Sequence, residues 1–349
     1  MRGRYMAILP VFAAGTLILV GATKEQESSK AGDTLWEQAT LYFKPLPDVA
    51  ANPENAITEA KVELGRELYF DTRLSLNSTI SCNSCHSLAL FGVDGLPTSP
   101  GDDGRKGDRN SPTVLNAALH GSQFWDGRAR DVEEQAGMPI LNPIEMAIPS
   151  EEFLVERLSQ VPAYQEAFRK AFPGDPAPLS YGNIQRALGA FERTLLAPSS
   201  FDDYLRGDRA ALDADQLEGL RLFLDLGCSS CHNGVNVGAG SFRKFGLNDP
   251  YWVHTRSAKV DEGRLKVTGD EEDRYVFRVA SLRNVAQTAP YFHDGSVAKL
   301  DETVRIMVRL QVGLDLEPLQ VRQMTAFLGS LTGRVDPDVA RGAEPKGTL

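Results

Sequence analysis

The sequence predicts a mainly α-helical protein made of two consecutive helical units with long loops. Three observations support this fold class. Apolar residues recur at helical spacing in several segments, strand-like runs are sparse, and one order of elements is repeated along the chain. That order is a helix, a Cys-x-x-Cys-His motif, a loop region and an apolar closing helix.

The first half of the chain shows this order clearly. Thr58 is placed to cap a helix whose apolar side chains share one face and which ends near Asp71. The motif Cys82–His86 follows this helix. After a glycine- and proline-containing loop, residues 153–172 are predicted to form one helix, and residues 184–195 form the amphipathic closing helix.

The second half repeats the plan. Asp213 is placed to cap a helix that runs into the motif Cys228–His232, and a glycine-rich segment, Gly234–Gly246, is predicted to be loop. The closing helix covers about Glu317–Leu331. Between them, Tyr275–Val279 is predicted to form a short extended segment.

The two closing helices share a residue pattern, Ala-Phe-x-x-Thr/Ser-Leu, at Ala190–Leu195 and Ala326–Leu331. This repeat indicates an internal duplication with a junction near Pro198–Ser200. The predicted boundaries are an N-terminal domain over residues 36–197, a C-terminal domain over 198–334 and a tail over 335–349.

Cys-x-x-Cys-His is the attachment signature of a c-type haem. Each cysteine can add to one vinyl group of the porphyrin, and the adjacent His86 or His232 can reach the iron as an axial ligand. A single copy is also compatible with half of a zinc site or with a redox pair. Here the two copies use every cysteine of the chain, which leaves none for a disulfide or a separate zinc site. The attachment cysteines are Cys82, Cys85, Cys228 and Cys231. The sequence therefore predicts two covalent haems.

The N-terminus has the pattern of an export signal. Arg2 and Arg4 precede an apolar run, Met6–Val20, and cleavage is expected near Ala22. Residues 1–22 are thus predicted to be a signal peptide, with an uncleaved membrane anchor as the alternative, and residues 23–35 a flexible lead-in. Both alternatives place the globular part outside the cytoplasm, where bacterial c-type haem attachment also occurs.

Composition and charge exclude some partners. The chain has 349 residues, 42% of them hydrophobic, and a formal net charge of −10. This charge argues against nucleic acid and anionic membrane surfaces as partners, and it is compatible with a basic redox partner.

Several further stretches match one protein family in order along the chain. The sequence resembles the bacterial di-haem cytochrome c peroxidases, with the MauG-type enzymes as close relatives. The stretches that carry the resemblance are Leu96–Pro100, Arg109–Asn116, Phe124–Arg128, Asn142–Met146 and Thr288–His293. The resemblance implies two cytochrome c-like domains in a periplasmic enzyme that reduces H2O2. It also implies that the N-terminal haem is peroxidatic and that the C-terminal haem accepts electrons from a small donor, a c-type cytochrome or a cupredoxin.

Met307 lies where the family has the second axial ligand of the C-terminal haem. From the pattern alone, Met307 reads as a core residue, because Val304 and Leu310 share its helical face. The resemblance favours the ligand role, and histidine/methionine ligation raises the reduction potential, as an electron-accepting centre requires. MauG-type enzymes have tyrosine at this position, so the methionine indicates a peroxidase.

Four residues match positions around the family's peroxidatic haem. Glu145 matches the distal acid–base residue, Gln135 a distal hydrogen-bonding residue and Phe124 a distal pocket residue. Trp125 matches the tryptophan between the haems, where it is a plausible electron relay. Without the resemblance, Glu145 reads as a solvated carboxylate, Gln135 as a polar helix residue and Trp125 as an aromatic anchor at a domain interface.

Asn110, Thr288 and Pro290 match positions that contribute to the family's interdomain calcium site, and side-chain and carbonyl oxygens suit calcium. The resemblance therefore implies one bound Ca²⁺. It also allows a homodimer, because family members often dimerise when calcium is present.

The main departure from the family is Asp102, at the position where many members have a histidine that ligates the N-terminal haem before activation. No histidine occurs between His86 and His120. We therefore expect an open or water-ligated peroxidatic haem that needs no prior reduction. His293 matches a family histidine that we interpret as structural, while His120 and His254 match no assigned role.

Two other functions remain open from the sequence. One is a non-catalytic di-haem electron carrier, which would have both irons six-coordinate and would need no distal carboxylate. The other is oxidative modification of a partner protein, as in the MauG-type enzymes.

Overall fold

The computed structural model describes residues 32 and 34–340 of the chain. The predicted signal peptide (1–22) and most of the predicted lead-in and tail lie outside these residues. The chain divides into two compact units, residues 1–41 and 42–349, and residues 34–41 of the first are helical. The described part contains no helix with the length and apolar character needed to span a bilayer. The domain junction predicted near residues 198–200 falls inside the second unit and stays a prediction.

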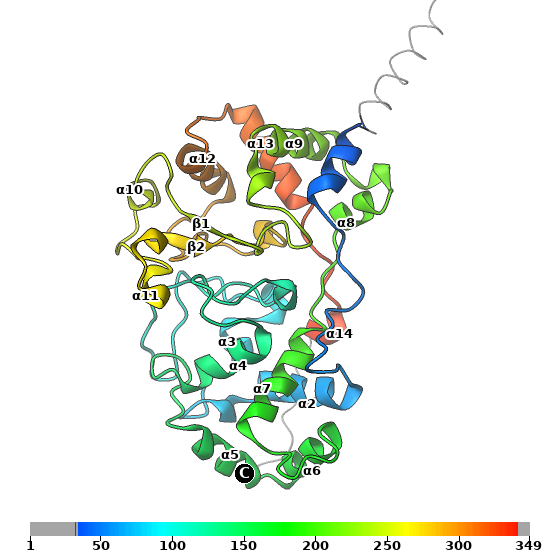
Figure 1. Cartoon of the computed structure of the whole chain (residues 1–349), viewed down its shortest axis with the longest axis vertical. Helices are drawn as coiled ribbons and strands as arrows, with labels where there is room; N and C mark the ends of the chain where they lie inside the picture. Colours follow the sequence, from blue (N-terminus) through cyan, green and yellow to red (C-terminus); the bar gives the residue numbers. More distant parts are fainter. Residues whose placement is uncertain (1–31, 33, 341–349) are drawn as a thin grey trace, which may run out of the picture. The chain divides into compact units, whose positions relative to one another are not determined.

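Residues 42–340 are mainly helical, which confirms the predicted fold class, and two groups of helices are evident (Figure 1). The first group contains α2 (Glu59–Phe70), α3 (Cys82–Cys85), α4 (Val132–Leu141), α5 (Glu151–Ser159), α6 (Pro162–Ala171) and α7 (Tyr181–Glu192). Apolar faces of α2, α5, α6 and α7 enclose one continuous core, in which Leu64, Leu154, Phe168 and Leu188 are fully buried.

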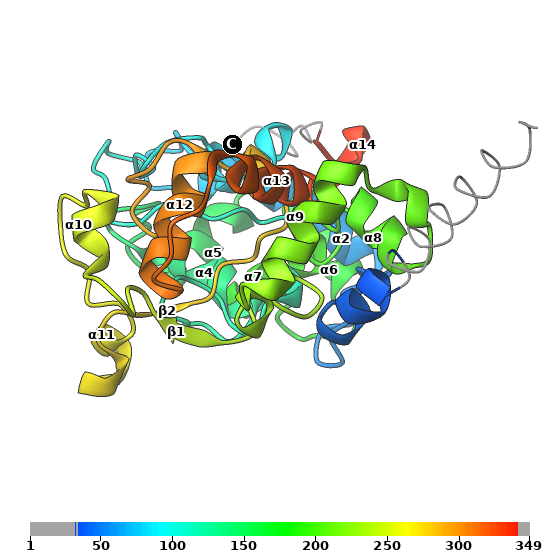
Figure 2. The same cartoon turned by 90° about the horizontal axis from the view of Figure 1, so that it is seen from above.

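The second group contains the helices that follow the second motif and the one that precedes it. They are α9 (Ala214–Asp225), α10 (Tyr251–Thr255), α12 (Leu300–Gln311) and α13 (Pro318–Gly329). Shorter helices are α8 (Ser200–Leu205), α11 (Leu265–Thr268) and α14 (Pro337–Ala340). In both views α9 and α13 lie side by side (Figures 1 and 2).

The helix starts expected before the two motifs are confirmed. The Thr58 hydroxyl accepts a hydrogen bond from the Lys61 N–H at the start of α2, which ends at its C-cap, Asp71. At the start of α9, Asp213 accepts from the Gln216 N–H, and the Gln216 side chain accepts in return from the Asp213 N–H. These caps satisfy N–H groups that the first helical turn leaves without a partner.

The internal duplication extends to the helix crossings. A Cβ atom added at Gly65 in α2 would lie 1.9 Å from the carbonyl oxygen of Ala187 in α7. A Cβ added at Gly219 in α9 would likewise lie 1.9 Å from the carbonyl oxygen of Gln323 in α13. In each half, glycine therefore lets the helix before the haem motif touch the backbone of the closing helix.

A second repeated feature lies in the loops. Asn116 and Asn284 are both fully buried and both have left-handed backbone conformations, with φ of 62° and 63°. The Asn116 side-chain oxygen accepts from the Ala197 N–H, and that of Asn284 accepts from the Gly333 N–H. Each asparagine therefore ties the loop after its haem motif to the chain that follows its closing helix.

The structure corrects two predictions. Residues 153–172 form two helices, α5 and α6, because Pro162 has no N–H to continue the first helix and begins the second at its first position. The segment Gly234–Gly246 contains a strand, β1 (Phe242–Lys244), which pairs antiparallel with β2 (Val276–Arg278). The extended segment predicted at Tyr275–Val279 is confirmed as β2.

Candidate active site

The first Cys-x-x-Cys-His motif lies on α3, which follows the capping residue Ser81. Cys82 and Cys85 are free thiols, and burial raises the pKa of the Cys85 thiol to about 11. The His86 Nδ1 atom lies 3.0 Å from the Pro112 carbonyl oxygen, so Nδ1 donates there and Nε2 is available to a metal. Burial also lowers the pKa of His86, which favours the neutral imidazole that metals bind.

The second motif has the same arrangement. The His232 Nδ1 atom lies 3.2 Å from the Ala280 carbonyl oxygen, and burial lowers the pKa of His232 to about 4. Gly238, with φ of 133°, is required here, because an added Cβ would lie 2.2 Å from that carbonyl oxygen and 3.2 Å from Nδ1. The chain therefore presents Nε2 of His232, like that of His86, to a metal.

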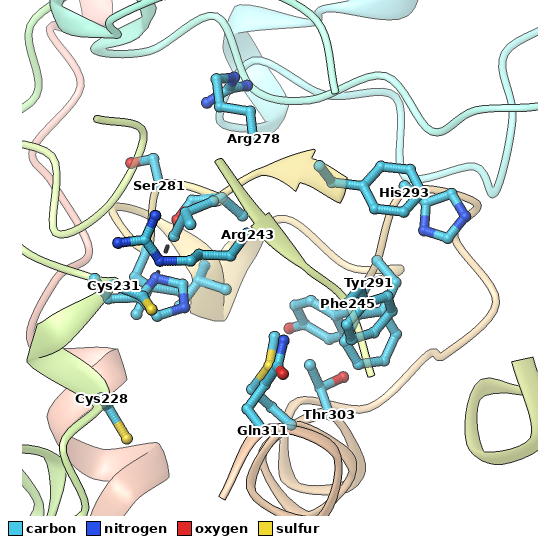
Figure 3. Close-up of a pocket in the computed structure, with 18 of the residues that line it drawn as sticks. Cys228, Cys231, Arg243, Phe245, Arg278, Ser281, Tyr291, His293, Thr303 and Gln311 are labelled. Atoms are coloured by element: carbon cyan, nitrogen blue, oxygen red, sulfur yellow. Dashed lines mark hydrogen bonds between the residues drawn. The ribbon is translucent and has the colours of Figure 1, made fainter. Parts of the chain in front are cut away.

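A cavity of about 610 Å³ adjoins the second motif. Cys228 and Cys231 line this cavity (Figure 3). His232 and Met307 from α12 also line it. The structure thus brings the predicted attachment residues and the predicted second axial ligand to one cavity, within the volume range of cofactor sites. Met307 remains a predicted ligand.

Glu145 lies in the turn that follows α4. The Asn142 side-chain amide donates a 2.7 Å hydrogen bond to Glu145 Oε1. Burial raises the pKa of the Glu145 carboxyl above its usual range, although the positive charge of Arg128 and the bond from Asn142 act in the opposite direction. Gln135 is half-buried on α4 itself, so one helix and its final turn supply both predicted distal residues.

Phe124 and Arg128 belong to the same turn. Phe124 has φ of 66°, an uncommon conformation for a residue with a side chain, and such strain is often found at functional sites. The Arg128 guanidinium carbon lies 3.5 Å from the centre of the Phe124 ring, and Arg128 also pairs with Asp126. Since the positive charge of Arg128 lowers the pKa of Glu145, this turn lies near the carboxylate.

Trp125 lies between the two halves of the protein. Its indole N–H donates to the Asn110 carbonyl oxygen at 2.9 Å, and its ring contacts His293 edge to face at 6.4 Å between centroids. The turns that carry Trp125 and His293 have the same backbone pairing. Gln123 and Ala129 form an isolated antiparallel β-bridge in one turn, and Tyr291 and Val297 form one in the other. The duplication therefore places Trp125 and His293 at equivalent positions.

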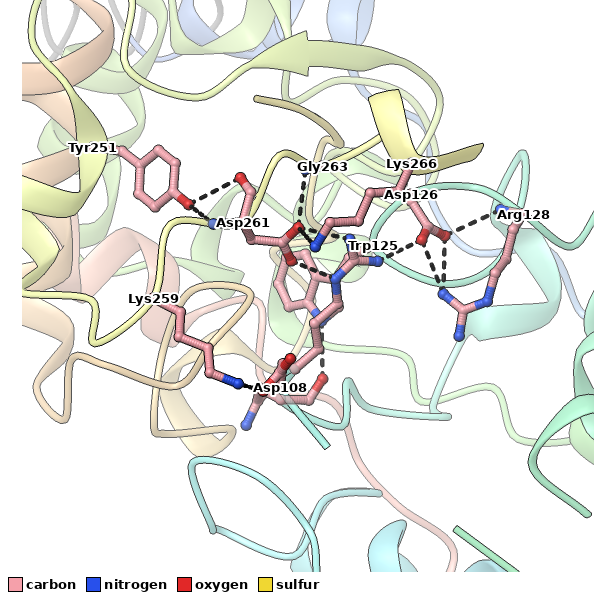
Figure 4. A network of polar contacts seen from close by, with 11 residues as sticks. Asp108, Trp125, Asp126, Arg128, Tyr251, Lys259, Asp261, Gly263 and Lys266 are labelled. Atoms are coloured by element: carbon pink, nitrogen blue, oxygen red, sulfur yellow. Dashed lines mark hydrogen bonds and ion pairs between the residues drawn. The ribbon is translucent and has the colours of Figure 1, made fainter. Parts of the chain in front are cut away.

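An ion-pair network surrounds Trp125 (Figure 4). Arg109 pairs with both Asp126 and Asp261, and Lys266 also pairs with Asp261. Hydrogen bonds and the Arg109 charge lower the pKa of Asp261 far below its usual range, although its burial opposes this shift. The network links the turn that carries Trp125 to the loop before α11 in the C-terminal half.

Asp102 is held away from solvent by three donors. Its carboxylate accepts from the Ser75 hydroxyl, the Asn77 N–H and the Thr79 hydroxyl. Burial raises the pKa of Asp102, but these bonds outweigh it and lower the pKa overall. The Asp102 N–H donates to the Glu145 carbonyl oxygen at 2.8 Å, so the Asp102 loop lies directly beside the turn that carries Glu145.

The three residues predicted to bind calcium all line the cavity beside the second motif. They are Asn110, Thr288 and Pro290. The Asn110 side-chain NH2 donates to the Leu96 carbonyl oxygen, so its oxygen is the end left for a cation. Within the described residues no group of three or more His, Cys, Asp or Glu side chains could hold a metal ion. The calcium site stays a prediction.

Sequence reasoning missed the residues that support this site. Asn142, Arg128 and Arg109 lie inside the stretches that carry the family resemblance, but their roles depend on contacts with Glu145, Phe124 and Asp261. Because Asp261 is distant in sequence, no local pattern could have indicated its pairing with Arg109.

The residues present fit two covalently bound haems. Each half offers two free thiols and a neutral histidine whose Nε2 is available to iron. A buried arginine nitrogen without a partner also lines the cavity beside the second motif. The fold and these sites define a di-haem c-type cytochrome protein.

Comparison with known proteins agrees with this class. Residues 59–210 match the family described as di-haem cytochrome c peroxidase. The chain is 46% identical to the cytochrome c551 peroxidase of Pseudomonas aeruginosa over 92% of this chain and 91% of that protein. It is 45% identical to the Nitrosomonas europaea enzyme of that name over 82% of this chain and 83% of that one.

A solved structure supports the same conclusion. A MauG-like protein associated with microbial copper homeostasis superposes with a TM-score of 0.73 at 31% identity, over 87% of this chain and 96% of that one. The chain therefore belongs to the di-haem cytochrome c peroxidase family, as its motifs predict. It is a peroxidase whose cofactor is a pair of c-type haems.

Proposed function

We propose that this peroxidase works in the periplasm and reduces H2O2 to two waters with two protons and two electrons. The electrons come one at a time from a small donor protein, a c-type cytochrome or a cupredoxin. The single observation that carries the proposal is the half-buried Glu145 carboxylate, which is oriented by Asn142 and lies close enough to the first haem motif to act on the pKa of Cys85. A protein that only carries electrons needs no such acid–base group.

Bound haem c supplies the iron chemistry, which accepts peroxide and stores electrons that arrive singly. Cys82, Cys85 and His86 would hold the peroxidatic haem, and Cys228, Cys231, His232 and Met307 the electron-accepting haem. The chain's own part in the reaction is to move protons and to position the groups around them.

Glu145 is the proposed proton carrier. Breaking the O–O bond requires a proton to leave the oxygen nearer the iron and a proton to reach the departing oxygen. The Glu145 carboxylate can accept the first proton and return it, and the amide of Asn142 fixes its orientation at 2.7 Å. Gln135 and Phe124 are proposed to orient the peroxide and to shape the space around it.

Trp125 is the proposed relay between the two haems. Its ring lines the cavity beside the second motif, and its turn carries Phe124 on the side of Glu145. The hydrogen bond to the Asn110 carbonyl oxygen and the ion pairs of Arg109 fix the indole, and a fixed aromatic ring suits repeated electron transfer.

We propose that the enzyme needs no prior reduction, because it has Asp102 where many relatives have a ligating histidine. Hydrogen bonds from Ser75, Asn77 and Thr79 support this proposal, since they hold the carboxylate against the turn at residues 75–79. A histidine could enter the sixth position only from elsewhere in the chain, and the next histidine, His120, lines the cavity beside the second motif.

A single Ca²⁺ bound by Asn110, Thr288 and Pro290 is also part of the proposal. Of these residues, Asn110 accepts a hydrogen bond from the Trp125 indole through its carbonyl oxygen, so calcium at Asn110 would stabilise the relay. Titrating Ca²⁺ into chelator-treated protein in a calorimeter should show one site per chain, and Asn110→Ala should weaken it. An unchanged isotherm in this variant would exclude these residues.

The function is tested by steady-state H2O2 reduction with a reduced small c-type cytochrome, using the purified ferric di-haem protein with and without pre-reduction. We expect turnover without pre-reduction, and cyanide binding to one of the two haems. Turnover that appears only after pre-reduction would contradict the Asp102 proposal. Two haems closed to cyanide, with no turnover, would contradict the peroxide reaction and indicate an electron carrier.

A further inference from the structure

A buried arginine beside the second haem motif has no carboxylate partner. Arg278 is 4% exposed and ends β2, where its side chain lines the cavity shared by Cys228, Cys231 and His232. Its Nη1 atom has no hydrogen-bond partner, and no Asp or Glu of the described residues pairs with it. A buried charge without a counter-charge is costly, so this position is suited to an anion that the cavity receives.

Neighbouring arginines differ in this respect. Arg283 lines the same cavity but is fully paired with the buried Asp202, through both Nη atoms. Arg264 donates to the Asp126 carbonyl oxygen and pairs with Asp273. Arg243 also lines the cavity and donates to the Phe242 carbonyl oxygen, but it is exposed, so water can solvate its charge. The distinguishing property of Arg278 is that its charge is both buried and without a carboxylate partner.

His120 is a second unsatisfied group on the cavity wall. Within the described part of the chain, neither ring nitrogen has a partner at hydrogen-bond geometry; Gln123 lies close enough to act on the pKa of His120, but its amide N–H donates to the Ala117 carbonyl oxygen. Burial and the positive charge of Arg278 lower the pKa of His120 well below its usual range, so the two side chains are close and the histidine is neutral. Two buried side chains with unsatisfied nitrogens on one cavity wall favour a polar ligand group there.

The position of Arg278 in the cavity indicates which ligand group would meet it. In Figure 3, Arg278 lies at the opposite side of the cavity from Cys228. The cysteines fix the vinyl edge of a c-type haem, and the propionate carboxylates project from another edge of the same ring. A carboxylate that meets a guanidinium makes a charge-assisted hydrogen bond, the strongest kind available to this arginine.

We propose that Arg278 pairs with a propionate carboxylate of the haem attached at Cys228 and Cys231. The Arg278 Nε–H donates to the Phe124 carbonyl oxygen at 3.0 Å, and its backbone N–H donates to the Trp125 carbonyl oxygen at 2.7 Å. Arg278 thus joins the C-terminal haem to the turn that carries the proposed relay and a proposed distal residue. The proposal rests on haem binding, which the family establishes, and not on the donor or the peroxide step.

The test is a potentiometric titration of both haems in Arg278→Gln, Arg278→Lys and Arg264→Gln. A positive charge beside a propionate stabilises the reduced iron, so Arg278→Gln should lower the reduction potential of the C-terminal haem alone. We expect about a tenfold change in the reduction equilibrium, or about 59 mV for one electron. Arg278→Lys keeps the charge and should recover most of the potential.

Arg264→Gln is the matched control, because Arg264 also donates to a carbonyl of the Phe124–Asp126 turn but has its own carboxylate partner. An unchanged potential in Arg278→Gln, or an equal fall in Arg264→Gln, would overturn the proposal. If Arg278→Gln does not accumulate with two haems, the resonance Raman spectrum of Arg278→Lys is compared with that of the native protein instead. A shifted propionate bending band would support the pairing, and an unshifted band would overturn it.

Discussion

Replacing Glu145 by glutamine removes the proposed proton carrier with little change in shape. The Asn142 amide can still donate to the side-chain oxygen, as it does at 2.7 Å in the native protein, so the turn after α4 should keep its structure. General acid–base groups contribute about 10²–10⁴-fold in rate. We therefore expect kcat/KM for H2O2 to fall by about 10²–10⁴-fold, or about 3–5 kcal/mol in the activation barrier.

The pH dependence gives this prediction a second measurement. The carboxylate form of Glu145 must accept the proton, and burial raises its pKa, so the native rate should fall as the pH drops through a value above the usual glutamate range. This fall in rate at low pH, the acid limb of the pH profile, should be absent in Glu145→Gln. In Arg128→Gln it should move to higher pH, because Arg128 lowers the pKa of Glu145.

The assay is stopped-flow reaction of the ferric protein with H2O2 across pH, together with steady-state turnover. Glu151→Gln, the same substitution at an exposed position at the start of α5, is the control and should match the native protein. Haem content and absorption spectra should be unchanged in both variants. Native-like rates and an intact acid limb in Glu145→Gln would show that another group carries the proton.

Three further predictions follow from the packing and the ligands. Gly219→Ala should destabilise the protein by about 1–3 kcal/mol in guanidinium unfolding, because its Cβ would meet the α13 backbone at 1.9 Å. Gly182→Ala, in open space on α7, should not destabilise it, and equal losses would contradict this reading. Met307→His should lower the reduction potential of the C-terminal haem alone in a potentiometric titration, since methionine ligation raises it; an unchanged potential would exclude Met307 as a ligand. Although burial opposes it, hydrogen bonds from Arg193 and Asn55 lower the pKa of Glu133 to about 2. Stability should therefore fall as the pH drops from about 4.5 towards 2, with a shallower slope in Glu133→Gln; equal slopes would contradict the shift.

The sequence alone determined the features that adjacent residues encode. The two Cys-x-x-Cys-His motifs, the caps Thr58 and Asp213 and the repeated closing helices each depend on a few neighbouring residues, so the pattern contains the whole signal. The fold class and the family followed from them. The break at Pro162 was also visible, and the prediction of one helix over residues 153–172 gave too little weight to the missing N–H.

Tertiary structure alone decided which distant residues meet. Two examples are the pairing of β1 with β2 and the contact of Arg109 with Asp261, which join segments separated by tens to more than a hundred residues. A third is the burial of Arg278 at a position where no carboxylate pairs with it. Such contacts are set by how the helical groups and their loops pack, and no local pattern specifies them. The raised pKa of Glu145 has the same origin, because burial is a property of the folded chain and not of the residue.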